Sequence, residues 1–337
     1  MNKSYATNFA IETGNDHFLF ITLHSFDHKF ADSPDDIIEK CHIYCVVDFP
    51  RITFIPDSLE YKIIGNELIY RVLLEYRYQG EIKRVGIEDR ITNFSNISKI
   101  TIDKYPYIDI VFWDSNDNFI MSATAIKIAY AFNIKDLTDL KVLYIGKSTG
   151  IKKTKNALDR AKEHSTIQKI LANHNIKHPD RSLLVGLFNF GTVKKYAFVD
   201  GIDQTKVFGL EDFNRLKNAQ HFHLPLDTKT AIIESALIRY FEPEYNEKLK
   251  KDLPAKNSKI LSECYKYDFS AIVVKLWTSD EKDPFLNYYL YSDKVKKSAK
   301  HNISIELIDP EIRKGFFSIG GENWAPEGTI KRNKKMK

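Results

Sequence analysis

The residue pattern changes near residue 121, and this change limits what the chain can fold into. Before it, short aromatic and β-branched runs are separated by tight-turn pairs, such as Gly65-Asn66 and Gln79-Gly80. This spacing predicts an antiparallel sheet of hairpins, and we expect a β-rich domain over residues 1–120. After residue 121, strand-like runs alternate with helical patterns, which predicts a mixed α+β or α/β multidomain protein.

Residues 121–250 predict one compact α/β domain. Its expected strands cover residues 126–134, 142–145 and 183–190, and its expected helices cover residues 157–172 and 230–241. We expect Asp227 or Thr228 to cap the second helix. Residues 191–226 are expected to form an irregular insertion that carries substrate contacts.

The remaining residues, 251–337, predict a smaller α+β domain. Expected strands at residues 269–277 and 303–308 are followed by a basic tail at residues 331–337.

The charge is distributed unevenly along the chain. Residues 1–118 hold 12 Lys+Arg and 19 Asp+Glu, whereas the remainder holds 38 and 26. We therefore expect a polyanion such as DNA to bind the second part. No run approaches the ~18 apolar residues of a membrane helix, and the N-terminus lacks the apolar core of a signal peptide. The three cysteines form no disulfide framework, so we expect a cytoplasmic protein that contacts no membrane.

A single carboxylate interrupts an apolar helix. The helical neighbours of Glu234 at three and four residues' distance are Thr230, Ala231, Leu237 and Ile238. A helix that is apolar nearly all round is buried. A lone buried carboxylate is costly unless it is protonated, paired or bound to a metal. Glu234 is therefore either a metal ligand or one half of a buried salt bridge.

Two groups that can bind phosphate are spaced by one helical turn. Arg160 and His164 are four residues apart, so a helix would present them on one face. Arg supplies a fixed fork of donors, and His supplies a donor or a titratable proton. The alternative is a solvated face on which Arg160 pairs with Glu163.

The segment around these residues is basic. Lys147, Lys152, Lys153 and Lys155 are candidate contacts to a DNA backbone. Gly146-Lys147-Ser148 does not indicate a nucleotide-binding phosphate loop, because position 141 is Lys where that motif requires Gly.

Taken together, these motifs resemble the GIY-YIG nuclease family over roughly 120 of the 337 residues. The second signature triplet is Tyr144-Ile145-Gly146, and the first would fall on Ile128-Ala129-Tyr130, with Ile128 in place of glycine. The other matching positions are Arg160, the His164 found one turn later in restriction-type members, Glu234, and the Pro243 and Asn246 that follow the late helix.

The resemblance implies a core with a small antiparallel sheet flanked by helices, and a Mg²⁺-dependent DNA endonuclease in which Mn²⁺ can substitute. It implies that Glu234 holds the metal ion, and that Tyr130 or Tyr144 takes the proton of the attacking water. Nearby cations such as Lys147 would lower the pKa of that tyrosine.

Three further residues receive roles from the same resemblance. It implies that Arg160 stabilises charge on the phosphate, that His164 orients the nucleophile or relays its proton, and that Asn246 positions its neighbours.

DNA is the expected partner, and a homodimer is left open. We expect a role in restriction or anti-phage defence, by analogy at the level of the fold. Two alternatives remain: a nucleic-acid-binding sensor with weak or no turnover, and a DNA-repair nuclease.

Overall fold

The computed structural model describes residues 5–22, 35–65, 67–92, 96–148, 157–199, 208–247, 259–279, 287–308, 316–319 and 329–330. Within these ranges the chain is mixed α/β, and its strands form four sheets. The expectation of a mixed protein rich in strands is confirmed. No helix in the described part of the chain is long and apolar enough to cross a membrane.

The central sheet carries the residues of interest. Its strand order is β15 (Tyr289–Tyr291), β11 (Asp139–Lys147), β3 (Ile43–Pro50), β12 (Arg181–Asn189) and β2 (His17–Thr22). β3 pairs antiparallel with β11 on one side and with β12 on the other. The register shifts between Val142 and Tyr144, which indicates a bulge in β11.

A second five-stranded sheet also joins distant parts of the chain. Its order is β13 (Val193–Val199), β1 (Thr7–Gly14), β14 (Phe269–Trp277), β16 (Lys300–Glu306) and β17 (Thr329–Ile330). β14 and β16 agree with the strands expected at residues 269–277 and 303–308. Both five-stranded sheets contain strands from residues 1–120, 121–250 and 251–337. The sheets therefore do not follow the boundaries that the sequence suggested.

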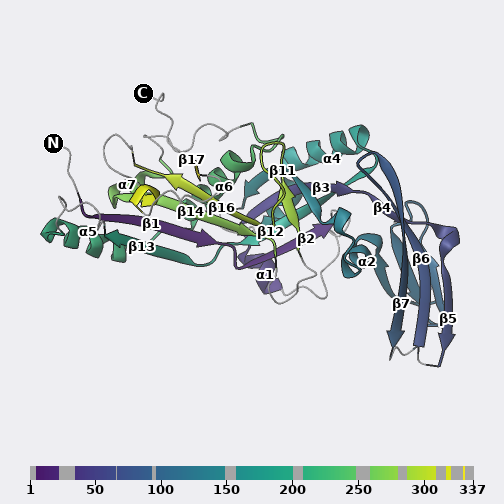
Figure 1. The fold of residues 1–337 in the computed structure, drawn as a ribbon. Helices are drawn as coiled ribbons and strands as arrows, with labels where there is room; N and C mark the ends of the chain where they lie inside the picture. Colours follow the sequence, from purple (N-terminus) through teal and green to yellow (C-terminus); the bar gives the residue numbers. More distant parts are fainter. Residues whose placement is uncertain are drawn as a thin grey trace.

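Only residues 51–124 form the expected meander of hairpins. One sheet holds β4 (Ile52–Phe54), β5 (Glu60–Ile64), β6 (Glu67–Tyr78) and β7 (Glu81–Thr92), and the other holds β8 (Lys99–Ile102), β9 (Asp109–Trp113) and β10 (Phe119–Thr124). The turns at Gly65 and at Gln79-Gly80 fall where they were predicted. Figure 1 shows β5, β6 and β7 projecting from the rest of the molecule.

The helices lie among these sheets (Figure 1). They are α1 (Asp35–Lys40), α2 (Ala125–Ala131), α3 (Ala157–Glu163), α4 (Ser165–Lys177), α5 (Leu210–His221), α6 (Leu226–Phe241), α7 (Ser262–Lys266) and α8 (Phe316–Ile319). In the described ranges, the short 3-10 helix η2 (Pro56–Ser58) lies between β4 and β5, and η3 (Lys135–Leu137) lies between α2 and β11.

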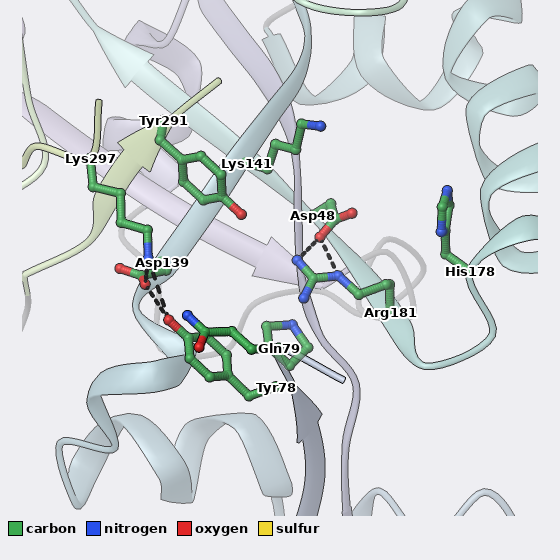
Figure 2. A pocket seen from close by; sticks show the side chains of 10 residues that line it. Asp48, Tyr78, Gln79, Asp139, Lys141, His178, Arg181, Tyr291 and Lys297 are labelled. Carbon is green, nitrogen blue, oxygen red and sulfur yellow. Dashed lines mark hydrogen bonds and ion pairs between the residues drawn. The ribbon is translucent and has the colours of Figure 1, made fainter. Parts of the chain in front are cut away.

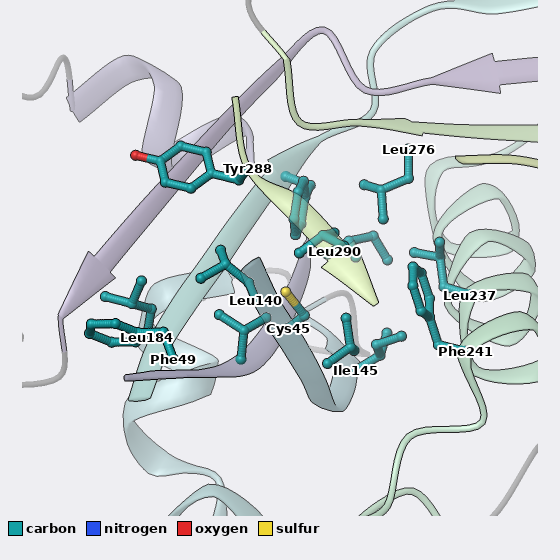
Figure 3. Packing of buried hydrophobic residues seen from close by; sticks show 14 of the residues in the cluster. Cys45, Phe49, Leu140, Ile145, Leu184, Leu237, Phe241, Leu276, Tyr288 and Leu290 are labelled. Carbon is teal, nitrogen blue, oxygen red and sulfur yellow. The ribbon is translucent and has the colours of Figure 1, made fainter. Parts of the chain in front are cut away.

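The two faces of β3 pack into different cores. Tyr44 and Val46 contact a cluster to which α3 and α4 contribute. Cys45 and Val47 point the other way, into the larger core that includes residues of α6. Figure 3 shows Cys45 and Ile145 in this larger core, with Leu237 and Phe241 of α6 close by. This alternation is the two-residue period of a strand that is buried on both faces.

Four local predictions were wrong. Residues 126–134 are not a strand: α2 begins after Thr124, whose hydroxyl accepts a hydrogen bond from the Lys127 amide at 3.2 Å. Residues 157–172 form two helices, because the chain is extended at His164. Residues 191–226 contain β13 and α5 rather than only irregular chain, although residues 200–207 lie outside the described ranges. Finally, α6 starts one turn early, after Pro225, without a side-chain cap.

Candidate active site

Tyr144 and His164 lie side by side on the face of the central sheet covered by α3 and α4. The Tyr144 hydroxyl is 3.5 Å from Nε2 of His164, and the ring centroids are 5.5 Å apart. His164 also caps α4, because its Nδ1 accepts a hydrogen bond from the Thr166 amide at 3.3 Å. An imidazole that accepts at Nδ1 carries its proton on Nε2 when it is neutral. His164 therefore presents a donor to the Tyr144 hydroxyl.

Arg160 is exposed at the end of α3 and acts on this pair through its charge. The pKa of His164 is lowered, first by burial and then by the Arg160 cation. The same cation opposes the rise that burial causes in the pKa of Tyr144. The helical spacing that predicted this pair does not hold, because the chain leaves the helix at His164. Arg160 and His164 nevertheless lie close enough for the Arg160 cation to lower the pKa of His164.

Glu234 of α6 lies near Tyr144 and Tyr44, close enough to act on both through its charge. Burial raises its pKa to about 7, and the nearby Lys147 cation opposes that rise. The carboxylate in turn raises the pKa values of Tyr144 and Tyr44. Among the described residues, none forms a hydrogen bond or ion pair with Glu234. The buried salt bridge that was the alternative for this residue is thus not found in the described part of the chain.

Asn246 fixes the position of β11. Its Oδ1 accepts from the Ile145 amide and its Nδ2 donates to the Ile145 carbonyl, each at 2.9 Å. The Tyr245 amide donates to the Leu143 carbonyl at 3.0 Å. Asn246 is buried, and both of its bonds go to the backbone of the Tyr-Ile-Gly strand. This geometry agrees with the positioning role expected for Asn246.

Tyr44 was not predicted as a site residue. It lies on β3, opposite the Tyr-Ile-Gly strand, and its ring centroid is 6.2 Å from that of Tyr144. Burial raises the pKa of Tyr44 and the nearby Tyr144 hydroxyl adds to this rise, whereas Tyr44 in turn opposes the rise in the pKa of Tyr144. A Cβ at Gly146 would lie 2.5 Å from the Tyr44 ring, so only glycine fits there. The sequence shows Tyr44 only as one aromatic residue in a strand, because its relevance depends on which strand pairs with β11.

Tyr130, by contrast, lies in a different core. It is at the end of α2, and its ring packs against Tyr288 with the centroids 5.0 Å apart. Burial raises the pKa of Tyr130 well above its ordinary value, and its hydroxyl has no hydrogen-bond partner among the residues that the structure describes. The interpretation of residues 126–134 as a strand was wrong because a short apolar run fits a buried helix equally well.

The predicted basic residues are only partly described. Lys147 ends β11, is half-buried, and acts on Glu234 through its charge. Contrary to expectation, the pKa of Tyr144 is raised, first by burial and then by Glu234; Arg160 rather than Lys147 is the cation that opposes this rise. Lys152, Lys153 and Lys155 lie outside the described residues.

The described residues contain no group of three or more His, Cys, Asp or Glu side chains that could hold a metal ion. A closed site with several protein ligands is therefore not present among them. A hard cation that keeps most of its water needs only one or two carboxylates, and Glu234 can supply one.

No protein-family model, curated protein or solved structure matches this chain.

Proposed function

We propose that the chain is a metal-dependent DNA endonuclease of the GIY-YIG type. The proposal rests on one observation, that Tyr144, His164 and Glu234 lie close together. They come from a strand, from the junction of two helices and from a helix distant in the sequence. Arg160 adds a cation, and Asn246 fixes the strand that holds Tyr144. A tyrosine, a neutral histidine, an arginine and a half-buried carboxylate together suit the hydrolysis of a phosphodiester.

Within this proposal, the two tyrosines and His164 handle the proton of the attacking water. Nε2 of His164 lies 3.5 Å from the Tyr144 hydroxyl, and a donor there stabilises the deprotonated form. Tyr44 and Arg160 oppose the rise that burial and Glu234 cause in the pKa of Tyr144. Arg160 is exposed and close to both residues, so it can contact the phosphate and stabilise the charge that develops there. Lys147 lies on the Glu234 side of the group and contributes a second cation.

Glu234 fits the role of a metal ligand. Its carboxylate is half-buried, has no bonding partner among the described residues, and has a pKa raised by burial. Mg²⁺ accepts a single carboxylate together with water and phosphate oxygens. When bound there, Mg²⁺ or Mn²⁺ would act as a Lewis acid on the phosphate. Binding a cation would also favour the charged form of Glu234.

The pairing of β3 with β11 also suggests a different location for the first signature triplet. His42-Ile43-Tyr44 lies on the antiparallel neighbour of Tyr144-Ile145-Gly146, whereas residues 128–130 lie in α2. We propose that Tyr44 takes the place that the resemblance gave to Tyr130, with His42 at the position of the glycine. Nδ1 of His42 lies 3.3 Å from the Ser148 hydroxyl and so links the ends of the two strands.

A cleavage assay tests the proposal. The protein is incubated with supercoiled plasmid, linear duplex and single-stranded DNA, with Mg²⁺, with Mn²⁺ and with EDTA. We expect cleavage that requires the metal ion and is lost in Glu234→Gln. Glu263→Gln is the matched control, because Glu263 lies on another helix, where it forms an exposed ion pair with Lys266. Metal-independent cleavage, or equal cleavage by Glu234→Gln, contradicts the proposal.

The same assay separates the remaining alternatives. A protein that binds DNA but cuts none of the substrates would be a nucleic-acid sensor. Preference for branched or damaged DNA would indicate a repair nuclease. We place the protein in restriction or anti-phage defence by analogy, and sequence-specific cleavage of plasmid DNA would support that setting.

A further inference from the structure

A pocket of about 430 Å³ lies at the other end of β3 and β11 from the tyrosine pair. Three parts of the chain form it: the central sheet, the tip of the β6–β7 hairpin and the segment around β15 (Figure 2). Its volume lies within the range of small-molecule sites. Asp48 of β3 lines it, four residues along the strand from Tyr44, which places the pocket about 13 Å from the tyrosine pair.

Tyr44 and the pocket residue Asp48 lie on the same face of the central sheet. Tyr44, Val46 and Asp48 alternate onto one face of β3. Lys141 is directly opposite Asp48 in the register, and Arg181 reaches the Asp48 carboxylate from β12. Val46, between Tyr44 and Asp48, is fully buried in the cluster to which α3 and α4 contribute, so a strand that reached both sites would pass around these helices.

The carboxylates in the pocket already have partners, whereas the cations can bind more. Asp48 accepts from Nε and Nη2 of Arg181 and lies 3.1 Å from Nε2 of His174. Asp139 accepts from Lys297 and, at 2.9 Å, from the Tyr78 hydroxyl. Nη1 of Arg181 forms no bond to a described residue. Among the described residues Lys141 forms an ion pair with the highly exposed Asp293, a weak contact that a ligand can replace.

Tyr291 marks the centre of this cationic group. Burial raises the pKa of its hydroxyl, and the charge of Asp48 adds to this rise. The charges of Arg181, Lys297 and Lys141 oppose it. Figure 2 shows this hydroxyl pointing toward the space between Asp139 and Arg181. Three cations around one aromatic hydroxyl form a site for an anion that also carries a ring.

Gln79 adds a group that can recognise a base. It sits at the tip of the hairpin with φ 51°, a left-handed conformation that favours Gly or Asn over Gln. Its side chain nevertheless lines the pocket, and its amide offers both a donor and an acceptor. A disfavoured backbone conformation that holds a polar side chain in a pocket suggests a functional reason for that residue.

We infer that this pocket binds one nucleotide, with its phosphate at Lys141, Arg181 and Lys297, its base against Tyr291 or Tyr78, and the base edge at Gln79. The inference rests on the proposed function to the extent that the nucleotide belongs to a DNA strand that also reaches Tyr144. A free nucleotide has the same chemistry, and the experiment separates these two sources.

The first arm measures the binding of dAMP, dGMP, dCMP, dTMP and inorganic phosphate to the full chain by calorimetry, without metal and at low salt. We expect at least one nucleotide to bind about tenfold more tightly than phosphate, and to lose about tenfold in Lys141→Ala and in Gln79→Gly. Gln79→Gly relieves the left-handed conformation, so its melting temperature should not fall. Lys99→Ala is the control, because Lys99 forms a similar surface pair with Asp117 at 2.8 Å in another sheet.

The second arm measures the binding of an oligonucleotide across a salt series in EDTA. If the nucleotide belongs to DNA, Lys141→Ala should reduce the slope of log K against log salt by about one. If the slope and the affinity are unchanged while dNMP binding is lost, the ligand is a free nucleotide.

Equal binding of phosphate and nucleotides, or nucleotide binding that no pocket variant alters, overturns the inference. DNA cleavage without any pocket effect would overturn this inference alone, and pocket binding without cleavage would overturn only the proposed function.

Discussion

The Asn246 side chain binds both backbone groups of Ile145, accepting from its amide and donating to its carbonyl at 2.9 Å each. At this edge of β11, the Asn246 side chain thus supplies the pair of hydrogen bonds that a neighbouring strand would supply elsewhere in the sheet. Both bonds are buried. The contact holds the backbone next to Tyr144, so the stability of the strand and the geometry of the candidate active site depend on the same amide.

We therefore expect Asn246→Ala to lose both stability and activity. It leaves a buried N–H and a buried C=O without partners, at about 1–3 kcal/mol for each such group. Urea denaturation measures this loss. Asn118→Ala removes an exposed amide that bonds Asp114, and should change stability by no more than about 0.5 kcal/mol. Equal stability of Asn246→Ala and the wild type would contradict this role.

Replacing Glu234 should have the opposite effect on stability. Burial raises its pKa from the ordinary value of 4.5 to about 7, so the folded state holds a proton that the unfolded state releases between these values. Stability is therefore lost as the pH rises from about 4.5 to 7. At pH 8, Glu234→Gln should be more stable than the wild type by at most about 3 kcal/mol, while cleavage is abolished.

Thermal melts at pH 5 and pH 8, with and without Mg²⁺, check this prediction. The stabilisation by Glu234→Gln should be small at pH 5 and larger at pH 8. Mg²⁺ should raise the melting temperature of the wild type but not that of Glu234→Gln. A structural salt bridge predicts the reverse, namely a less stable variant at pH 8 and no specific effect of Mg²⁺.

His164 and Arg160 should control the acid side of the rate profile. The pKa of His164 is lowered by burial and by Arg160, so its imidazole is neutral at pH 7 and is protonated only in more acidic solution. Arg160→Ala removes one of these causes and should move the acid limb to higher pH. It should also reduce turnover by about 10²–10³-fold, roughly 2.7–4 kcal/mol, with little loss of DNA affinity.

Single-turnover rates from pH 5 to pH 9 measure both effects. The shift in the acid limb should disappear when Arg160→Ala is made in a His164→Gln background, because His164 is then absent. If Arg160→Ala weakens only DNA binding and leaves turnover intact, Arg160 is a positioning residue.

Three tyrosine-to-phenylalanine variants separate the candidate bases, since each removes one hydroxyl and little else. We expect Tyr144→Phe to reduce turnover by about 10²–10⁴-fold, and Tyr44→Phe to reduce it less, because Tyr44 acts through the pKa of Tyr144. Tyr130→Phe removes a buried hydroxyl that has no partner in the described part of the chain, so it should leave turnover unchanged and not lower stability. Loss of turnover in Tyr130→Phe alone would restore the location of the first triplet that the sequence suggested.

Local signals explain most of what the sequence predicted correctly. Turn pairs located the hairpins around Gly65 and Gln79, and a long apolar pattern located α6 apart from its first turn. The order of motifs identified Tyr144, His164 and Glu234, which the structure brings together although they are distant in the chain. Each of these residues is marked by its immediate neighbours, so pattern and order could single it out as a candidate.

The remaining features depend on contacts between distant segments. No local pattern shows that β3 lies between β11 and β12, and for that reason Tyr44 was missed. A short apolar run fits either a strand or a buried helix, so Tyr130 was placed wrongly. The helix break at His164 depends on its side chain capping α4, a role that Ser, Thr, Asp or Asn more often fills.

The pairing of β3 also changes what a truncation can show. The charge difference suggested that residues 121–337 would bind DNA without residues 1–118. However, β1, β2 and β3 come from those first residues, and β3 pairs along both of its edges in the central sheet. Removing β3 exposes the unpaired edges of β11 and β12 and deletes Tyr44. We therefore expect residues 121–337 alone to be unfolded or aggregated, with no cooperative transition in urea.

Deleting only residues 59–92, which hold the projecting strands, and joining the ends with a short Gly-Ser linker should leave the central sheet folded. A folded, DNA-cleaving fragment of residues 121–337 would show that β3 is not required for the candidate active site.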